Sequence, residues 1–192
     1  MKHIELACYL IQKPNILPHV LEFGVYKGVS LTRIKEKIGL YGYELFGFDS
    51  FEGLPEDWFN SIEDEVVLEK GFFSLQEEEN LKFVMDGVNL YTGWFKDTIP
   101  DYLKIAKPIA LLHIDCDLYS STKEVLYNLN DYIKSGTIIV FDEWIYGHNK
   151  KYNDHEQKCF FEWVNDFKRE FELIDYVTEG DMTEQQIVRI VK

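Results

Sequence analysis

Short apolar runs alternate along the chain with segments whose apolar residues recur at helical spacing. Strands are expected at residues 19–24, 43–49, 87–93, 108–115 and 136–144, and helices at 30–38, 77–85, 122–133 and 155–171. Strands joined by helices pair in parallel, because a long crossover returns the chain in the same direction. Two last runs, 171–177 and 185–192, have no helix between them. We therefore predict an α/β fold with a doubly wound sheet of about seven strands, mostly parallel with one antiparallel closing strand.

Charge and composition exclude several classes of protein. The net charge of −14 opposes binding to the phosphates of nucleic acids and to anionic membranes. No apolar run reaches the ~18–20 residues of a transmembrane helix, and the first 18 residues lack the cleavage pattern of a signal peptide. Three cysteines without paired spacing argue against disulfides and structural zinc. We expect one domain, 1–192, in the cytoplasm, with no nucleic-acid or membrane partner.

Acidic residues close three of the expected strands. Asp49, Asp115 and Asp142 each stand at a carboxyl end. Ligands of such sheets bind outside the carboxyl ends of the strands, near the point where strand order reverses. A bare buried carboxylate is costly unless it is paired, hydrogen-bonded or bound to a metal. These ends are therefore either solvated turns or one rim of a site.

The segment "VLEFGVYKGVS", residues 20–30, joins the first expected strand to a helix. Gly24 and Gly28 allow a tight turn and a close approach of the backbone to a ligand. The loop leads into a helix N-terminus, which favours an anionic or polar group. Its GxxxG spacing differs from the dinucleotide GxGxxG pattern. An ordinary strand–helix turn is the alternative.

Asp49 follows the second expected strand, 21 residues after Gly28. An acid at this place can accept hydrogen bonds from both ribose hydroxyls of an adenosine-containing cofactor. A solvated turn aspartate is the alternative.

Asp115, Asp142 and Glu143 offer oxygen donors from two strand ends that are expected to be neighbours. Hard cations such as Mg²⁺ prefer carboxylates, and no Cys/His spacing points to a softer metal. The alternative is that Glu143 faces solvent and Asp142 caps a turn. Asp117 lies beyond the strand end, and we expect it to open the following helix.

Five segments occur in an order that resembles the macrocin O-methyltransferase family. They are "LEFGVYKGVS", "GFDSFEGLP", "GWFKDTIP", "HIDCDLYSST" and "GTIIVFDEW". The family comprises Rossmann-like, class I S-adenosylmethionine-dependent enzymes that methylate sugar hydroxyls, many with Mg²⁺. The resemblance covers roughly residues 20–167. The first segment is also similar to that of catechol O-methyltransferase.

The resemblance implies a role for each matching residue. Those expected to line the cofactor are Glu22, Gly24, Tyr26, Gly28 and Ser30 at the methionine part, Asp49 with Ser50 and Phe51 at the ribose, Gly93 and Trp94 near the adenine, and Asp115. Asp115, Asp142 and Glu143 are expected to hold Mg²⁺. The family usually has Asp-Asp or Asp-Asn at the last pair, so Glu143 departs from the pattern and can act through a water.

The general base is not fixed by the resemblance. Catechol O-methyltransferase has a lysine three residues after its first metal aspartate, where this chain has Leu118. Candidates are His155, His113 and Asp115 itself. For His113 the alternative is a core histidine with one hydrogen bond, and for His155 an exposed residue at a helix start.

The predicted activity is methyl transfer from S-adenosylmethionine to a sugar or polyol hydroxyl, with a sugar or sugar-nucleotide acceptor. Three other functions stay open: a metal-independent methyltransferase, a nicotinamide-dependent oxidoreductase and a non-catalytic cofactor-binding module. The sequence leaves open a homodimer. It also leaves open whether the acidic segment 56–70 is a solvated insertion or a lid over the site.

Overall fold

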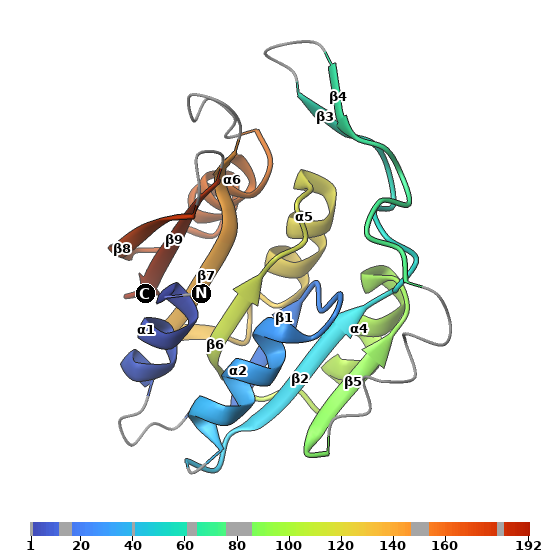
Figure 1. Cartoon of the computed structure of the whole chain (residues 1–192). Coiled ribbons are helices and arrows are strands. Elements are labelled where there is room, and N and C mark those ends of the chain that lie inside the picture. Colours follow the sequence, from blue (N-terminus) through green and yellow to red (C-terminus); the bar gives the residue numbers. More distant parts are fainter. Residues whose placement is uncertain are drawn as a thin grey trace.

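A computed structural model describes residues 2–11, 17–39, 41–60, 65–75, 86–146, 154–179 and 183–192. Its main sheet has the strand order β5-β2-β1-β6-β7-β9-β8 (Figure 1). The strands of this sheet are β1 (His19–Phe23), β2 (Glu44–Asp49), β5 (Val88–Thr92), β6 (Ile109–Ile114), β7 (Ile133–Tyr146), β8 (Phe171–Glu179) and β9 (Thr183–Ile190). The order reverses between β1 and β6, which is where a ligand is expected to bind.

Pairing directions confirm the predicted fold class. Strands β5, β2, β1, β6 and β7 pair in parallel. Strand β9 runs antiparallel to both β7 and β8, so it is the one reversed strand of the sheet. Strands β1 and β6 are buried along their whole length, as central strands covered on both faces are.

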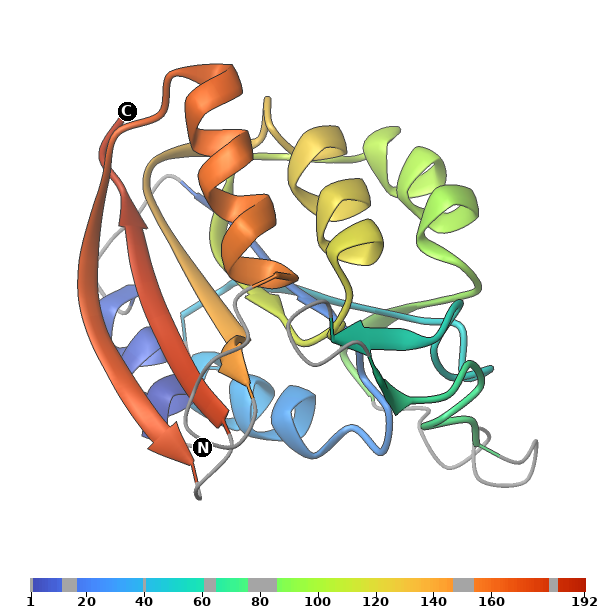
Figure 2. The ribbon, with the colours of Figure 1, turned by 90° about the horizontal axis from the view of Figure 1, so that it is seen from above.

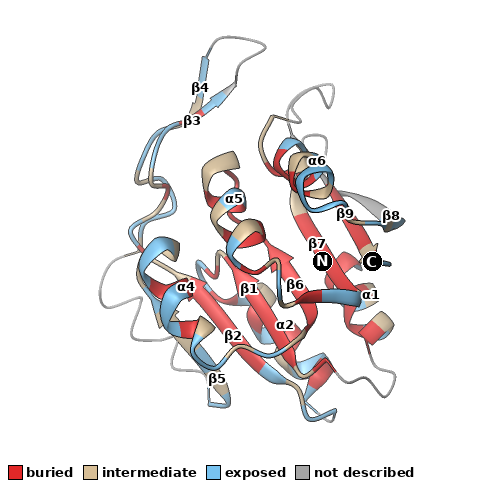
Figure 3. Cartoon of the chain, turned by 180° about the vertical axis from the view of Figure 1, so that it is seen from behind, coloured by how far each residue is buried: buried red, intermediate tan, exposed pale blue. Residues whose placement is uncertain are grey.

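Helices cover both faces of the sheet (Figure 2). Helices α1 (Lys2–Ile11) and α2 (Val29–Ile38) lie on one face. Helices α4 (Phe95–Leu103), α5 (Tyr119–Asn128) and α6 (Glu156–Phe167) lie on the other. Each face has its own apolar core, and the central strands between them are almost entirely buried (Figure 3).

Helix α1 was not predicted. Its buried residues are His3, Ile4, Ala7, Cys8 and Ile11. They recur at helical spacing, so one face of the helix packs against the sheet and α2. His3 is the polar member of this buried face, and its ring points into the sheet.

Two helix boundaries differ from the sequence prediction. The helix expected over 122–133 is α5, which begins at Tyr119 and ends at Asn128. Ile133 instead begins β7, because residues 129–132, which include Asn130 and Asp131, form a turn between the helix and the strand. The helix expected over 155–171 ends at Phe167, where Lys168 adopts a left-handed conformation. Phe171 then begins β8. The helix expected over 77–85 lies outside the described residues.

Helix α4 contains Pro100, which disfavours a helical interpretation of that segment.

The acidic segment 56–70 contains a two-stranded hairpin of β3 (Trp58–Asn60) and β4 (Glu65–Leu68). Figure 1 shows this hairpin beyond the carboxyl ends of the parallel strands.

A close backbone contact joins the first loop to the end of β6. Gly24 has φ +91°, and a Cβ built on it would lie 1.6 Å from the carbonyl oxygen of Asp115. The Asp115 N–H donates to Phe23 O at 2.9 Å, and the Gly24 N–H donates to Phe48 O at 3.0 Å. Glycine is required here both by conformation and by space.

None of the helices that the structure describes has the length and apolar character needed to cross a bilayer.

The contact at Gly24 generates a stability prediction. Gly24→Ala is expected to lower the free energy of unfolding by about 2–5 kcal/mol, because left-handed strain and a steric clash add. Gly42→Ala is the matched control: Gly42 also has positive φ, but its Cβ meets nothing within 4 Å, so only the strain of about 1–2 kcal/mol applies. Urea unfolding compares them. Equal losses in the two variants would contradict the close approach.

Candidate active site

A cleft of about 780 Å³ opens at the carboxyl ends of the parallel strands. This volume suits a cofactor together with part of a small acceptor. Eight residues singled out in the sequence line the cleft: Gly24, Tyr26, Asp49, Ser50, Gly93, Trp94, Asp115 and Glu143. Seven others do not: Glu22, Gly28, Ser30, Phe51, His113, Asp142 and His155.

Asp49 fixes the first loop. Its Oδ2 accepts hydrogen bonds from the N–H groups of Val25 and Tyr26, both at 2.7 Å. Its Oδ1 accepts one from Phe51 N–H at 2.7 Å. Tyr26 and Phe51 both have positive φ, so this carboxylate stabilises two strained turns. A carboxylate has about four acceptor positions, which leaves capacity for a ligand hydroxyl in the cleft.

The residues outside the cleft have other surroundings. Glu22 is fully buried, and its Oε1 meets His113 Nδ1 at 2.8 Å. Phe51 packs in the core beneath α2. Gly28, in a left-handed conformation, precedes α2, and its carbonyl accepts from Thr32 Oγ1. Glu22 therefore supports the strand from behind the cleft.

Three carboxylates form an oxygen-donor triad: Asp115, Asp142 and Glu143 each offer an oxygen within 4.8 Å of the others. Burial, and next the charge of Asp142, raise the pKa of both Asp115 and Glu143. Glu143 Oε2 is buried and has no hydrogen-bond partner within the described part of the chain. A divalent cation relieves this repulsion and takes up such an oxygen. The triad thus fits a hard cation.

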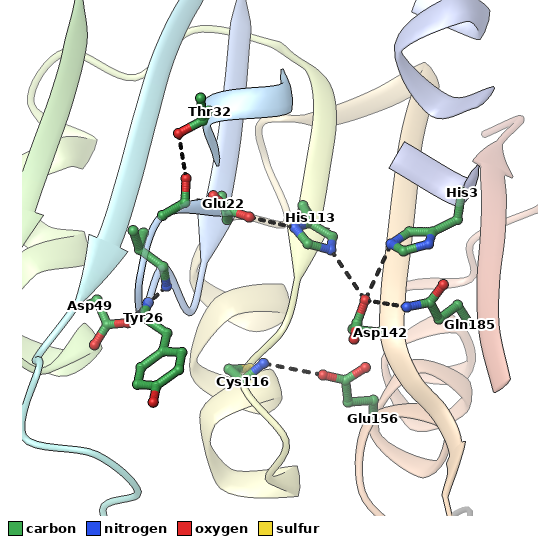
Figure 4. A network of polar contacts seen from close by, with 12 residues as sticks. His3, Glu22, Tyr26, Thr32, Asp49, His113, Cys116, Asp142, Glu156 and Gln185 are labelled. Atoms are coloured by element: carbon green, nitrogen blue, oxygen red, sulfur yellow. Dashed lines mark hydrogen bonds and ion pairs between the residues drawn. The ribbon is translucent and has the colours of Figure 1, made fainter. Parts of the chain in front are cut away.

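Asp142 is also held from behind (Figure 4). Gln185 Nε2 donates to its Oδ1 at 2.7 Å. His3 Nε2 and His113 Nε2 lie 3.2 and 3.7 Å from the same oxygen. Burial opposes ionisation of Asp142, but the contacts with His113 and His3 outweigh it and lower the pKa of this carboxyl. For His113, burial likewise opposes the charge, yet the Asp142 and Glu22 carboxylates raise its pKa.

Asp117 lies in the cleft rather than at the helix start. The residue that precedes α5 is Leu118, so the expectation that Asp117 opens this helix is wrong. Asp117 has φ +63°, which turns the loop back toward the cleft that it lines. It is 9% exposed. Burial, and next the Asp142 charge, raise the pKa of Asp117 to about 7.

His155 joins three elements. Its Nδ1 accepts from Tyr119 N–H at 3.1 Å, which leaves Nε2 to donate to Phe59 O at 3.0 Å. Trp58 contacts the ring edge-on, and burial lowers the pKa of the imidazole. Both nitrogens are thus engaged in tying the β3–β4 hairpin to the starts of α5 and α6.

Glu156 was not singled out in the sequence. It is fully buried in the first turn of α6. Its Oε1 accepts from Cys116 N–H at 3.4 Å and its Oε2 from Glu143 N–H at 3.1 Å. One side chain therefore links the loop after β6 to β7, and so brings the members of the oxygen-donor triad together.

The sequence model described as "Macrocin-O-methyltransferase (TylF)" matches residues 1–182. This chain belongs to that family. A relative from Streptomyces olivaceus, 8-demethyl-8-(2,3-dimethoxy-alpha-L-rhamnosyl)-tetracenomycin-C 4'-O-methyltransferase, is 27% identical over 177 residues, which are 85% of this chain and 63% of the relative. The chain thus spans less than two thirds of that relative's length.

Solved structures support the fold of this macrocin-O-methyltransferase family member. The calicheamicin methyltransferase CalS11 has a TM-score of 0.77 at 21% identity, over 98% of this chain and 77% of that one. An O-methyltransferase from Bacillus cereus in complex with SAH has a TM-score of 0.61 at 15% identity, over 100% of this chain and 81% of that one.

The position of Glu156 in this family member generates a second stability prediction. Glu156→Ala is expected to lower the free energy of unfolding by about 1–3 kcal/mol, because two N–H groups lose their acceptor away from water. Glu162→Ala on the same helix is the control. Glu162 accepts from the Tyr119 hydroxyl at a partly exposed place, where the loss is within about 0.5 kcal/mol. Thermal and urea unfolding measure both, and equal losses would contradict the linking role.

Proposed function

We propose that this chain is an S-adenosylmethionine-dependent O-methyltransferase that acts on a hydroxyl of a sugar, free or nucleotide-linked. One observation carries the proposal: the loop fixed by Asp49 and two members of the oxygen-donor triad, Asp115 and Glu143, line the same cleft. The family of the chain and the SAH complex of the Bacillus cereus enzyme support the choice of cofactor. The rhamnosyl substrate in the name of the Streptomyces olivaceus relative supports a sugar acceptor.

The cofactor would lie along the first and third loops. Asp49 would accept from a ribose hydroxyl, while Gly24 and Tyr26 would hold the methionine part. Gly93 and Trp94 would hold the adenine. Glu22, Gly28, Ser30 and Phe51 shape these loops from outside the cleft.

The oxygen-donor triad would hold Mg²⁺. When bound, this cation would supply a positive charge that lowers the pKa of the acceptor hydroxyl and orients it. Glu156 and the nitrogen atoms around Asp142 hold the oxygen-donor triad in place before any ligand binds. The protein's own contribution to the reaction is therefore to position the reacting groups.

Asp117 is the proposed proton acceptor. It lines the cleft on the loop that leaves β6, close to the end where the triad stands. His113 lies behind the cleft, and both nitrogens of His155 are engaged elsewhere. Asp117 therefore replaces the histidines as the first candidate. A carboxylate with access to the cleft can take the hydroxyl proton as the methyl group is transferred.

The β3–β4 hairpin is proposed to cover the acceptor. Trp58 packs on Leu54 and Leu118, and Ser120 Oγ donates to Glu56 Oε1 at 2.6 Å. Glu56 and Lys70, at the two ends of the hairpin, line the cleft. Residues 56–60 and 65–70 are thus positioned to shield the reaction from water.

Cofactor binding can be tested before an acceptor is known. Asp49→Ala is expected to weaken the binding of S-adenosylhomocysteine by about 1–3 kcal/mol, since buried hydrogen bonds to the ribose and the loop are lost. Asp101→Ala, at an exposed site on α4, is the control. Titration calorimetry measures both variants. Wild-type affinity in a folded Asp49→Ala protein would remove Asp49 from the cofactor site.

Methyl transfer to a panel of glycosides and sugar nucleotides separates the proton acceptor from the cation site. Asp117→Asn is expected to lower turnover by about 10²–10⁴-fold while the affinity for Mg²⁺ stays close to that of the wild type. Asp115→Asn is expected to lose both turnover and affinity for Mg²⁺, because a hard cation needs the negative charge of the carboxylate. Chelator should inactivate the wild type, and added Mg²⁺ should restore it. Full turnover in Asp117→Asn would exclude that residue as base, and full turnover in chelator would exclude the cation.

A further inference from the structure

Three side chains from distant parts of the sequence converge behind the cleft. His3 comes from α1, His113 from β6 and Asp142 from β7. We call them the histidine triad; its three ligand atoms lie within 4.8 Å of one another. Figure 4 shows both rings turned toward one oxygen of Asp142. Each histidine is only 1% exposed, so these nitrogens are withdrawn from bulk water.

The two histidines lie at ion-pair distance from Asp142. His3 Nε2 and His113 Nε2 are buried, and neither has a hydrogen-bond partner within the described part of the chain. Their separations from Asp142 Oδ1 are 3.2 and 3.7 Å. Two ligand atoms bound to one Zn²⁺ at about 2.1 Å lie about 3.0–3.4 Å apart. The spacing of the triad is therefore close to that of a ligand set.

Neighbouring side chains orient the members of the histidine triad. Glu22 Oε1 meets His113 Nδ1 at 2.8 Å, so this carboxylate engages one ring nitrogen while the other, Nε2, faces Asp142. Gln185 Nε2 donates to Asp142 Oδ1 at 2.7 Å. Histidine ligands of metals commonly donate their other nitrogen to a carboxylate, and carboxylate ligands are themselves hydrogen-bonded.

We propose that His3, His113 and Asp142 bind a divalent transition metal of the zinc class, at a site separate from the oxygen-donor triad and sharing Asp142 with it. Two imidazole nitrogens and one carboxylate oxygen favour such ions over Mg²⁺. A carboxylate has two oxygens, so Asp142 can serve both groups. The metal would fasten α1 to the centre of the sheet. No spacing motif marks this site, because its ligands come from three separate segments.

The test uses untagged protein stripped of metal with a chelator and kept in saturating Mg²⁺. Titration with Zn²⁺, by calorimetry against a competing chelator, is expected to show one equivalent that Mg²⁺ does not displace. Co²⁺ is expected to give a visible absorption spectrum of nitrogen and oxygen ligation. His3→Gln should weaken Zn²⁺ binding at least tenfold and remove the Co²⁺ spectrum. His19→Gln, which also removes a buried histidine, should change neither.

Glu22→Gln provides a second variant that keeps all three ligands. Loss of the carboxylate that contacts His113 should weaken Zn²⁺ binding about 10–100-fold, and circular dichroism confirms that each variant is folded. Absence of Zn²⁺ binding in Mg²⁺, or equal affinity in His3→Gln and the wild type, would overturn the proposal. Complete displacement of Zn²⁺ by Mg²⁺ would also overturn it, since both ions would then occupy the oxygen-donor triad. None of these results depends on methyl transfer, so the proposed function is judged separately.

Discussion

Repulsion among buried carboxylates is the constraint on which the site depends. Five acids gather after the end of β6, just past the part of β7 that pairs with it, and at the start of α6: Asp115, Asp117, Asp142, Glu143 and Glu156. Burial and like charge raise the pKa of all of them except Asp142, so each is costly to ionise. The chain offsets this cost with backbone N–H groups at Glu156 and side-chain nitrogens at Asp142. The cation that we propose for this site would offset the remaining repulsion.

The sequence was sufficient to predict the parallel strands of the main sheet and the edge at which the site lies. Apolar runs in the strands and a period of 3.6 in the helices are local properties of the sequence, so β1, β2, β5, β6 and β7 were located to within a few residues. Acids at strand ends then had to share one rim, because parallel strands end on the same side. Asp49, Asp115 and Glu143 line the cleft for this reason. Helix α4 was missed because Pro100 masks its helical character.

The parts of the site that the sequence did not predict depend on contacts between distant segments. Glu156 reads as an ordinary acid in the first turn of a helix, and only the packing of α6 on β7 reveals the two N–H groups it accepts from. His3 lies on a helix that the sequence did not predict. Asp117 enters the cleft through a left-handed turn. Aspartate adopts this conformation more often than most non-glycine residues do, but it is still uncommon, so the sequence alone does not predict it.

The polar network behind the cleft has a consequence for folding. Its contact between Glu22 and His113 joins residues 91 positions apart, and the contact of His3 with Asp142 joins α1 to β7. Closing such long loops lowers the entropy of the chain before any stabilising contact forms, and this cost slows folding. Individual helices and the β1–α2 unit can form early from local contacts. The network can close only after α1, β6, β7 and β9 have docked, so its burial marks the end of folding.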